Sequence, residues 1–437
     1  MSAKKLKIHF IGIGGIGVSA LAKYYLEKGY QVSGSDLVSS EITETLKKLG
    51  VKIFTPHQSK LGAGQVGKHK LPDLVIYSPA VKPDNPELKE AKKLKIKSLS
   101  YPEALGELTK KYFTIAVSGT HGKSTTTAML GLLLTKAGFD PTIIVGTKVK
   151  EFAPPAGGSN CRVGKSGYLV IEADEHMASF LNYWPKIIII TNIEADHLDY
   201  YKNLRNIKKA FNEFIGHLPE DGVLITNKSA DNKAFPKLKK ILKVPGAYNI
   251  YNASLALAVA RVLKIPDEVS FKALSGYKGS WRRFEEKKAK INNKKIILVS
   301  DYAHHPTEIR VTLEAAREKY PKKKIWCVFQ PHQYQRTYYL FKDFVKVFRQ
   351  APIDKIIITD IYDVAGREKR EIKEKVNSKE LIKAINKPWA IYLPFKKIKN
   401  YLKKNLQGRE VVIIMGAGDI YNLVGCLTDK RIKTKIK

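Results

Sequence analysis

A short apolar segment, followed by a glycine loop, a lysine and a run of hydroxyl residues, constrains this chain more than any other feature. Residues 112–127 read YFTIAVSGTHGKSTTT. This order predicts a strand over Tyr112–Val117 and a helix over Ser124–Ala137. Gly119 and Gly122 allow the connecting loop to aim its backbone N–H groups at one point, beside the positive end of the helix. The segment therefore predicts a phosphate-binding loop.

The lysine of this loop supports the same interpretation. In phosphate loops of the Walker type the lysine reaches the β- and γ-phosphates and the next hydroxyl residue binds Mg²⁺, which assigns these roles to Lys123 and Ser124. The chain has Val117 where the Walker spacing requires glycine, so the loop is of the shorter GTHGKS form. The alternative is an ordinary strand, turn and helix, but a lysine in the first turn opposes the helix dipole unless an anion lies beside it.

A second glycine loop lies near the N-terminus. A strand over Leu6–Ile11 leads into the loop GIGGIG and a helix over Val18–Glu27, and Asp36 follows at the spacing of a dinucleotide fingerprint, roughly 20 residues on. Such a loop binds a pyrophosphate, and NAD, FAD and UDP-sugars all carry one. We expect it to use Gly12, Gly14, Gly15, Gly17, Ser35 and Asp36.

Acidic residues follow two further predicted strands. Tyr168–Ile171 runs into EADEH, and Ile187–Thr191 runs into NIEADHLD. Ligands gather at the carboxyl ends of parallel strands, and magnesium prefers oxygen ligands. Glu172 and His197 are therefore the metal candidates, supported by Asp174, Glu175 and Asp196. Helix capping or a solvated acid cluster is the alternative for any one of these residues.

The last third of the chain alternates apolar runs with helical stretches, which indicates a second doubly wound sheet. The stretch Asn227–Pro245 before it is expected to be a plain lysine-rich connection. The predicted strands are Lys295–Val299, Ile325–Phe329, Lys355–Thr359, Ala390–Leu393 and Glu410–Met415.

Composition bounds the remaining possibilities. A length of 437 residues predicts two to four domains. The net charge of +36 is spread over the whole chain without a nucleic-acid-binding signature, so we interpret it as a lysine-rich surface. Its 3 cysteines are too scattered for a disulfide framework or zinc site. Without an export signal or an apolar run long enough to span a membrane, we expect a cytoplasmic protein that binds no nucleic acid and inserts into no membrane.

Several of these strings resemble the Mur ligases, the ATP-dependent amide-forming enzymes of bacterial cell-wall synthesis. GTHGKSTTT is similar to their ATP loop, and DYAHHPTE at Asp301–Glu308 and FQPH at Phe329–His332 look like the branch that joins L-alanine to UDP-N-acetylmuramate. IGIGGIG, SGSD, EADE, TNIEADHLD and GAGDI agree with that branch, in the same order, over nearly the full chain.

The resemblance implies three α/β domains. They are an N-terminal Rossmann-like domain for the UDP-sugar (1–107), a central P-loop ATPase domain (108–279) and a C-terminal Rossmann-like domain for the acceptor (280–437). It also implies ATP and Mg²⁺ as cofactors, UDP-N-acetylmuramate and L-alanine as substrates, and an acyl-phosphate intermediate. We expect a monomer or a weak homodimer.

The site residues that the resemblance implies fall into three groups. Lys123, Glu172 and His197 are catalytic, and the last two hold the metal together with Ser124. The residues expected to bind ATP are Gly119, Thr120, His121, Gly122, Lys123, Ser124, Thr125, Asn192, Arg283, Asp301 and His304. The residues expected to bind the acceptor are His332, Arg336 and Arg367, because a guanidinium can hold a carboxylate through two parallel hydrogen bonds.

The chain departs from the branch at a few positions, and other functions remain to be tested. Ser124 replaces the commoner threonine, Tyr248 stands where the branch usually has histidine, and Gln333 stands where it has arginine. The recycling ligase that attaches a ready-made tripeptide to the same UDP-sugar is the nearest alternative. A dinucleotide-dependent oxidoreductase and a basic nucleic-acid-binding ATPase are the alternatives outside the family.

Overall fold

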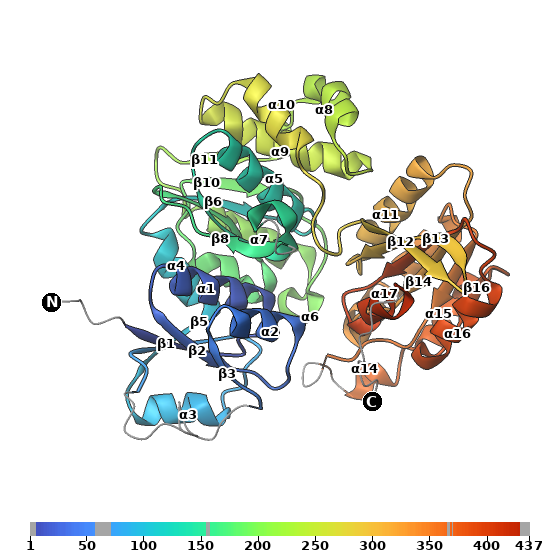
Figure 1. The fold of residues 1–437 in the computed structure, drawn as a ribbon, viewed down its shortest axis with the longest axis horizontal. Helices are drawn as coiled ribbons and strands as arrows, with labels where there is room; N and C mark the ends of the chain where they lie inside the picture. Colours follow the sequence, from blue (N-terminus) through green and yellow to red (C-terminus); the bar gives the residue numbers. More distant parts are fainter. Residues whose placement is uncertain (1–5, 57–70, 154–157, 365–367, 369, 429–437) are drawn as a thin grey trace. The chain divides into compact units, whose positions relative to one another are not determined.

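Three β-sheets flanked by helices make up the described part of the chain (Figure 1). The computed structural model describes residues 6–56, 71–153, 158–364, 368 and 370–428. Contacts divide the chain into two compact units. The first unit comprises Met1–Ile193, Ile207–Asn232 and Ala253–Ser275, and the second unit comprises Glu194–Asn206, Lys233–Asn252 and Gly276–Lys437. The expected α/β class is confirmed, with two sheets in the first unit and one in the second.

The first sheet has five parallel strands in the order β3-β2-β1-β4-β5. Its strands are β1 (Lys7–Ile11), β2 (Gln31–Ser35), β3 (Lys52–Phe54), β4 (Leu74–Tyr77) and β5 (Lys97–Ser100). Its helices are α1 (Ile16–Glu27), α2 (Glu41–Lys48), α3 (Pro86–Lys93) and α4 (Tyr101–Thr109). The order reverses beside β1, so the glycine loop after β1 lies where doubly wound sheets bind ligands.

The second sheet has six strands in the order β11-β10-β6-β9-β7-β8, parallel except for the pair β7 and β8. Its strands are β6 (Phe113–Ser118), β7 (Thr142–Val149), β8 (Ser159–Arg162), β9 (Tyr168–Glu172), β10 (Ile187–Ile190) and β11 (Val223–Ile225). The helices in this part of the chain are α5 (Lys123–Lys136), α6 (Leu198–Tyr201), α7 (Leu204–Ile215), α8 (Phe235–Ile241), α9 (Ala247–Val262) and α10 (Asp267–Ser275).

The third sheet also has six strands, in the order β12-β13-β17-β14-β15-β16. Its strands are β12 (Glu285–Ile291), β13 (Lys294–Asp301), β14 (Ile325–Phe329), β15 (Lys355–Ile358), β16 (Ala390–Tyr392) and β17 (Val411–Met415). Its helices are α11 (Pro306–Lys319), α12 (Tyr334–Tyr339), α13 (Phe341–Gln350), α14 (Arg370–Lys373), α15 (Ser378–Ile385), α16 (Phe395–Asn405) and α17 (Asn422–Leu427). Only β12 runs antiparallel, as the edge partner of β13.

The apolar runs that mark strands in the sequence are buried at the centres of these sheets. All four residues of β10 are buried isoleucines, and every residue of β14 and β17 is buried. Strands covered on both faces lose the alternating pattern and become continuously apolar. Each fully buried aliphatic side chain contributes about 1.5–3 kcal/mol relative to exposure. These sheets therefore provide rigid edges for the loops that follow their strands.

Two expectations need correction. The stretch Asn227–Pro245 is more than a plain connection, because it contains two short 3₁₀ turns and α8. Strand β12 was not expected, since EEKKAKI offers few apolar side chains. In the described part of the chain, no helix combines the length and apolarity that crossing a membrane requires.

Candidate active site

The predicted phosphate loop connects β6 to α5, and its glycines are required by the geometry. Gly119 has φ +126°, and a β-carbon there would lie 2.1 Å from Thr191 Oγ1. Gly122 has φ +84° and is the N-cap residue of α5. Both conformations are readily adopted by glycine and rarely by other residues. The N-terminus of α5 and its amide groups are thereby placed at the carboxyl end of β6, as a phosphate ligand requires.

Asn192 fixes the loop from the neighbouring strand end. Its side-chain oxygen accepts the N–H of His121 at 2.9 Å, and its amide group donates to the carbonyl of His121 at 3.0 Å. Its own carbonyl accepts the N–H of Thr120 at 3.0 Å. Asn192, expected among the nucleotide ligands, thus contacts the backbone of the loop itself. A loop held by three hydrogen bonds to one residue is preorganised for an anion.

Lys123 lies inside this loop as a nearly buried cation. Its Nζ is 2.7 Å from Glu175 Oε2 and 2.7 Å from the carbonyl of Gly119, and it is 3.8 Å from Asp174 Oδ1. Burial alone would lower the pKa of Lys123, but Glu175 and Asp174 outweigh burial and hold this pKa above its ordinary value. Lys123 is therefore protonated.

Glu172 and Ser124 meet beside the loop. The hydroxyl of Ser124 donates to Glu172 Oε1 at 2.8 Å, and the N–H of Gly146 donates to Glu172 Oε2 at 2.6 Å. A β-carbon on Gly146 would lie 2.8 Å from Glu172 Oε2, so glycine there makes room for the carboxylate. A hydroxyl and a carboxylate oxygen side by side are hard oxygen donors, which fit Mg²⁺. These two residues fit the metal that the sequence implies.

Two tyrosines that sense the charge of the same carboxylate, Tyr101 and the fully buried Tyr183, were not identified from the sequence. Burial, with the charges of Glu172 and Asp174, raises the pKa of Tyr101 above its ordinary value. Burial also raises the pKa of Tyr183 well above its ordinary value, with Tyr101 adding to the effect. Both phenols therefore stay neutral. In the structure, a β-carbon at Gly17 would lie 2.8 Å from the ring of Tyr101.

The loop after β1 is organised around Asp36. Its Oδ2 accepts the N–H of Gly14 at 2.7 Å, and its Oδ1 accepts the N–H of Leu37 at 2.8 Å. The carbonyl of Ser35 accepts the N–H of Gly12 at 2.8 Å, and Gly15 is the N-cap residue of α1. The expected UDP-sugar residues are therefore gathered at the neighbouring carboxyl ends of β1 and β2, with the carboxylate of Asp36 directed to the loop backbone. Ser35 itself is buried and donates its hydroxyl to Glu87.

The remaining expected nucleotide ligands lie in the second unit, at the end of β13. Asp301 accepts the N–H groups of Phe284 and Ala303, each at 2.8 Å, and burial raises its pKa to about 6. His304 Nδ1 is 3.0 Å from the carbonyl of Tyr302, and burial lowers the pKa of His304 to about 3. The guanidinium of Arg283 lies 5.1 Å from the ring centroid of Tyr302. These residues form one cluster of charged and aromatic groups.

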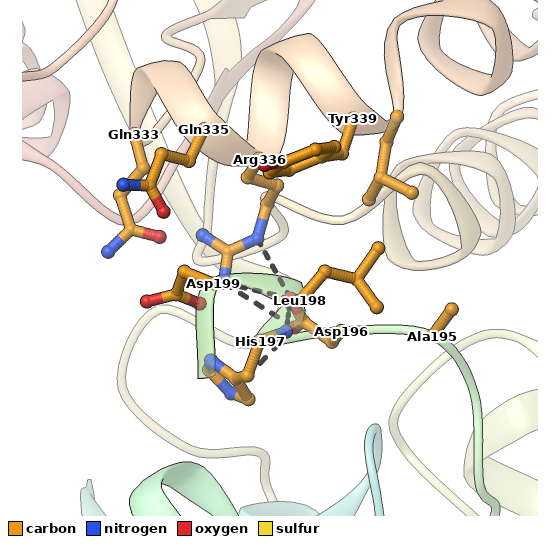
Figure 2. Close-up of a pocket in the computed structure, with 10 residues that line it drawn as sticks. Ala195, Asp196, His197, Leu198, Asp199, Gln333, Gln335, Arg336 and Tyr339 are labelled. Atoms are coloured by element: carbon orange, nitrogen blue, oxygen red, sulfur yellow. Dashed lines mark hydrogen bonds and ion pairs between the residues drawn. The ribbon is translucent and has the colours of Figure 1, made fainter. Parts of the chain in front are cut away.

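A small cavity of about 20 Å³ in the second unit lies between the segment at residues 195–199 and helix α12 (Figure 2). Figure 2 shows the guanidinium of Arg336 directed at Asp196. Arg336 Nε is 3.1 Å from Asp196 Oδ1, and Nη2 is 3.4 Å from Oδ2. Burial alone would raise the pKa of Asp196, but Arg336 and nearby histidines outweigh burial and hold it well below its usual range.

Two of the three expected acceptor residues, His332 and Arg336, lie in the described part of the chain. The ring of His332 stacks on Tyr362, with centroids 5.4 Å apart and planes 9° apart. Arg336 Nη1 donates to the carbonyl of His332 at 3.3 Å. Arg367 lies outside the described residues. The structure therefore brings His332 and Arg336 together, with the arginine bonded to protein groups.

The expected site residues are thus distributed over both units. The first unit holds the residues of both glycine loops together with Glu172 and Asn192, and the second unit holds His197, Arg283, Asp301, His304, His332 and Arg336. Two groupings were hidden from the sequence, namely the pair Lys123 and Glu175 and the pair Asp196 and Arg336. EADE and NIEADH mark the acids in the sequence, but not which cation each acid meets.

Family models match along nearly the whole chain. The Mur ligase family catalytic domain matches residues 7–113, the Mur ligase middle domain matches residues 117–244, and the Mur ligase glutamate ligase domain matches residues 282–418. The three models therefore follow the order of the three sheets.

Curated relatives are similar over nearly their full length. The UDP-N-acetylmuramate–L-alanine ligase of Acetivibrio thermocellus is 42% identical, over 95% of this chain and 94% of the relative. The enzyme of the same name from Alkaliphilus metalliredigens is 41% identical, over 96% of this chain and 97% of the relative.

Solved structures agree with the fold. The UDP-N-acetylmuramate–alanine ligase of Thermotoga maritima matches with a TM-score of 0.75 and 30% identity, over 95% of this chain and 97% of that chain. A murein peptide ligase from Psychrobacter arcticus matches with a TM-score of 0.70 and 21% identity, over 96% and 97% of the two chains, which shows the fold alone.

Proposed function

Because this chain belongs to the Mur ligase family, we propose that it is an ATP-dependent ligase that joins L-alanine to the lactyl carboxylate of UDP-N-acetylmuramate. The relatives of that name, about 40% identical over nearly the full chain, support this substrate pair. The observation that carries the proposal is the loop between β6 and α5. There a protonated lysine and a helix N-terminus converge beside the oxygen pair of Ser124 and Glu172.

The chemistry follows from this arrangement. The γ-phosphoryl group of ATP passes to the carboxylate oxygen of the sugar's lactyl group, ADP leaves, and an acyl phosphate results. The amine of alanine then attacks the acyl carbon, the amide bond forms, phosphate leaves, and the amine loses a proton. Lys123 and the amides at the start of α5 stabilise the charge that develops on the transferred group, since they are oriented before the reaction begins.

Magnesium would supply charge neutralisation on the phosphates when bound. In the first unit Ser124 and Glu172 would hold it, because their oxygens already lie side by side. His197 is proposed as a further ligand from its place in the sequence NIEADHLD. The proposed ATP ligands remain the loop Gly119–Thr125 and Asn192 in the first unit, and Arg283, Asp301 and His304 in the second.

We further propose the domain limits 1–107, 108–279 and 280–437, which the order of the family models supports. Gly12–Gly17 with Ser35 and Asp36 would bind the UDP-sugar. His332 would contact the acceptor, with Arg367 as a further candidate. A cytoplasmic location and a monomer or weak homodimer complete the proposal, and light scattering at micromolar concentration tests the assembly state.

A phosphate-release screen tests the proposed reaction. ATP, Mg²⁺ and UDP-N-acetylmuramate would be held constant while amino acids and the tripeptide L-alanyl-γ-D-glutamyl-meso-diaminopimelate are varied. We expect release with L-alanine and loss of release without the UDP-sugar. Preference for the tripeptide would identify the recycling ligase instead. NADH oxidation, or phosphate release stimulated by nucleic acid and indifferent to the sugar, would refute the ligase assignment.

A further inference from the structure

The segment that follows β10 is bonded to the helices of the third sheet. Glu194 Oε2 accepts the hydroxyl of Thr307 at 2.6 Å, and the carbonyl of Ala195 lies 3.3 Å from His305 Nε2. His305 and Thr307 stand at the start of α11. Glu194–Asn206 therefore belongs to the second unit by its contacts, although β10 belongs to the first.

The next residue along, Asp196, forms a buried ion pair. Its side chain is 9% exposed and that of Arg336 is 6% exposed. Besides the guanidinium, the carboxylate accepts the backbone N–H of His197 at 2.7 Å. One carboxylate thus connects an arginine of α12 to the main chain of the proposed metal ligand.

The hydrogen bond to Asp196 holds His197 in a strained backbone conformation. His197 has φ +51° and ψ +39°, the left-handed region that side chains other than glycine rarely adopt. Such a conformation costs of order 1–3 kcal/mol and persists only when neighbours fix it. The bond from the His197 N–H to Asp196 is one such restraint, and the bonds from the N–H groups of Tyr200 and Tyr201 to the His197 carbonyl are others.

All three side-chain nitrogens of Arg336 donate hydrogen bonds to protein groups. Nε and Nη2 bond to Asp196, and Nη1 bonds to the carbonyl of His332. The residue is 8% exposed. The side-on pair of donors, Nε and Nη2, is therefore already used for Asp196. An acceptor carboxylate held by that same pair would leave a buried carboxylate unpaired.

We propose that Arg336 is a positioning residue that acts through Asp196 to fix the backbone and ring direction of His197, and thereby tunes metal–nucleotide binding. This inference rests on the proposed function, since it takes His197 as a metal ligand. It differs from the expectation that Arg336 binds the carboxylate of alanine.

A double-mutant cycle on metal binding tests the inference without turnover. Mn²⁺ is titrated into the protein with a non-hydrolysable ATP analogue, and free Mn²⁺ is followed by electron paramagnetic resonance. Arg336→Lys keeps the charge but loses the planar pair of donors. We expect Arg336→Lys and His197→Ala each to weaken Mn²⁺ binding about tenfold or more. The double variant should bind no more weakly than His197→Ala alone, because Arg336 acts through His197.

Two further variants separate positioning from general damage. Asp196→Asn removes the charge pair but retains an oxygen for the His197 N–H, so its Mn²⁺ affinity should lie between those of the wild type and Arg336→Lys. Arg317→Lys is the matched control. Arg317 also bonds to a carboxylate of the second unit, with Nη2 2.8 Å from Asp354 Oδ2, and this change should leave Mn²⁺ binding within twofold of wild type.

The outcomes distinguish this inference from the proposed function. Unchanged Mn²⁺ binding in His197→Ala would refute the metal assignment and this inference together. A large effect in His197→Ala with none in Arg336→Lys would overturn the inference alone. The same would follow if Arg336→Lys raised the KM for alanine at unchanged Mn²⁺ affinity, or if the two single effects added in the double variant.

Discussion

The ammonium group of Lys123 lies 2.7 Å from the carboxylate of Glu175, so the cation expected to contact a phosphate is already paired with an acid of the EADE string. Burial raises the pKa of Glu175 and Asp174 adds to this effect, although Lys123 opposes the increase. The pair is therefore joined by a charge-assisted hydrogen bond in a nearly dry site. An incoming phosphate would compete with Glu175 for the same ammonium group.

Replacing Lys123 with alanine should abolish catalysis without unfolding the protein. Phosphate release should fall by about 10³-fold or more, since the charge on the transferred group loses its preorganised partner. Glu175 would be left without its cation, but a buried carboxyl can become protonated instead. We expect a melting temperature within a few degrees of wild type. Glu175→Gln is the paired variant and should retain turnover within about tenfold, so equal losses in both variants would contradict the proposed role of Lys123.

The hydroxyl at position 124 should decide the magnesium requirement. Ser124→Ala removes the oxygen that lies 2.8 Å from Glu172 Oε1, and the Mg²⁺ concentration for half-maximal phosphate release should rise about tenfold. Ser124→Thr keeps the hydroxyl and is the matched control, with an expected requirement within threefold of wild type. The KM for the UDP-sugar should change little in either. Identical Mg²⁺ titrations for alanine and threonine at this position would remove Ser124 from the metal site.

Gly14 should be essential for binding the UDP-sugar. A β-carbon at this position would lie 2.8 Å from Asp36 Oδ2, so Gly14→Ala displaces the carboxylate that organises the loop. Calorimetry should show affinity for UDP-N-acetylmuramate reduced about tenfold or more. Gly167→Ala is the control, because nothing lies within 4 Å of a β-carbon there. Wild-type affinity in Gly14→Ala, or NADH binding by the unmodified protein, would argue against the assignment.

The sequence predicts a structural feature well when that feature depends on residues close together in the chain, as the limits of a buried strand do. The strand Ile325–Phe329 was predicted with the observed limits, and the strand predicted over Ile187–Thr191 is observed over Ile187–Ile190, because buried parallel strands are continuously apolar. Strand β12 was missed because its neighbour β13 pairs with it at a sheet edge, where charged side chains are tolerated.

The ion pairs of the site could not be predicted in the same way. Lys123 and Glu175 stand on different strand ends, and Arg336 lies 140 residues from Asp196. Which acid meets which cation is set by strand order and by side-chain directions, and neither leaves a local pattern. The sequence thus indicates the types of residue at the site, while the structure alone indicates that Arg336 is committed to Asp196.

Acidification should weaken the second unit through His304. Its pKa is about 3 in the folded protein because burial disfavours the charged ring, whereas the unfolded chain takes up this proton near pH 6.5. Stability from this group is therefore present above pH 6.5 and is lost as pH falls toward 3, by about 2 kcal/mol at pH 5. His304→Asn should lose correspondingly less between pH 7.5 and 5. Denaturant unfolding at both pH values measures this difference.

The pH dependence must be measured as a difference between wild type and His304→Asn, because Asp301 titrates in the same pH range. Burial raises its pKa to about 6, so the folded state keeps this proton longer than the unfolded state does, and stability from Asp301 falls as pH rises from about 4 to 6. This contribution is common to wild type and His304→Asn and cancels in the difference. Parallel pH profiles for the two proteins would contradict the assigned protonation state of His304.

Acceptor selection should depend on His332 more than on Arg336. The ring of His332 is fixed between Tyr362, at a centroid distance of 5.4 Å, and His304, at 5.9 Å. A fixed imidazole can orient the amine or carboxylate of a small amino acid. His332→Ala should therefore raise the KM for alanine about tenfold, with ATP and UDP-sugar binding near wild type.

A pocket for one methyl group separates alanine from glycine only weakly, by about 1–3 kcal/mol, so glycine and serine should be slow substitutes. Steady-state phosphate release with each amino acid measures this order. A preference for glutamate would place the chain in another branch of the family, and an unchanged KM for alanine in His332→Ala would exclude His332 from the acceptor site.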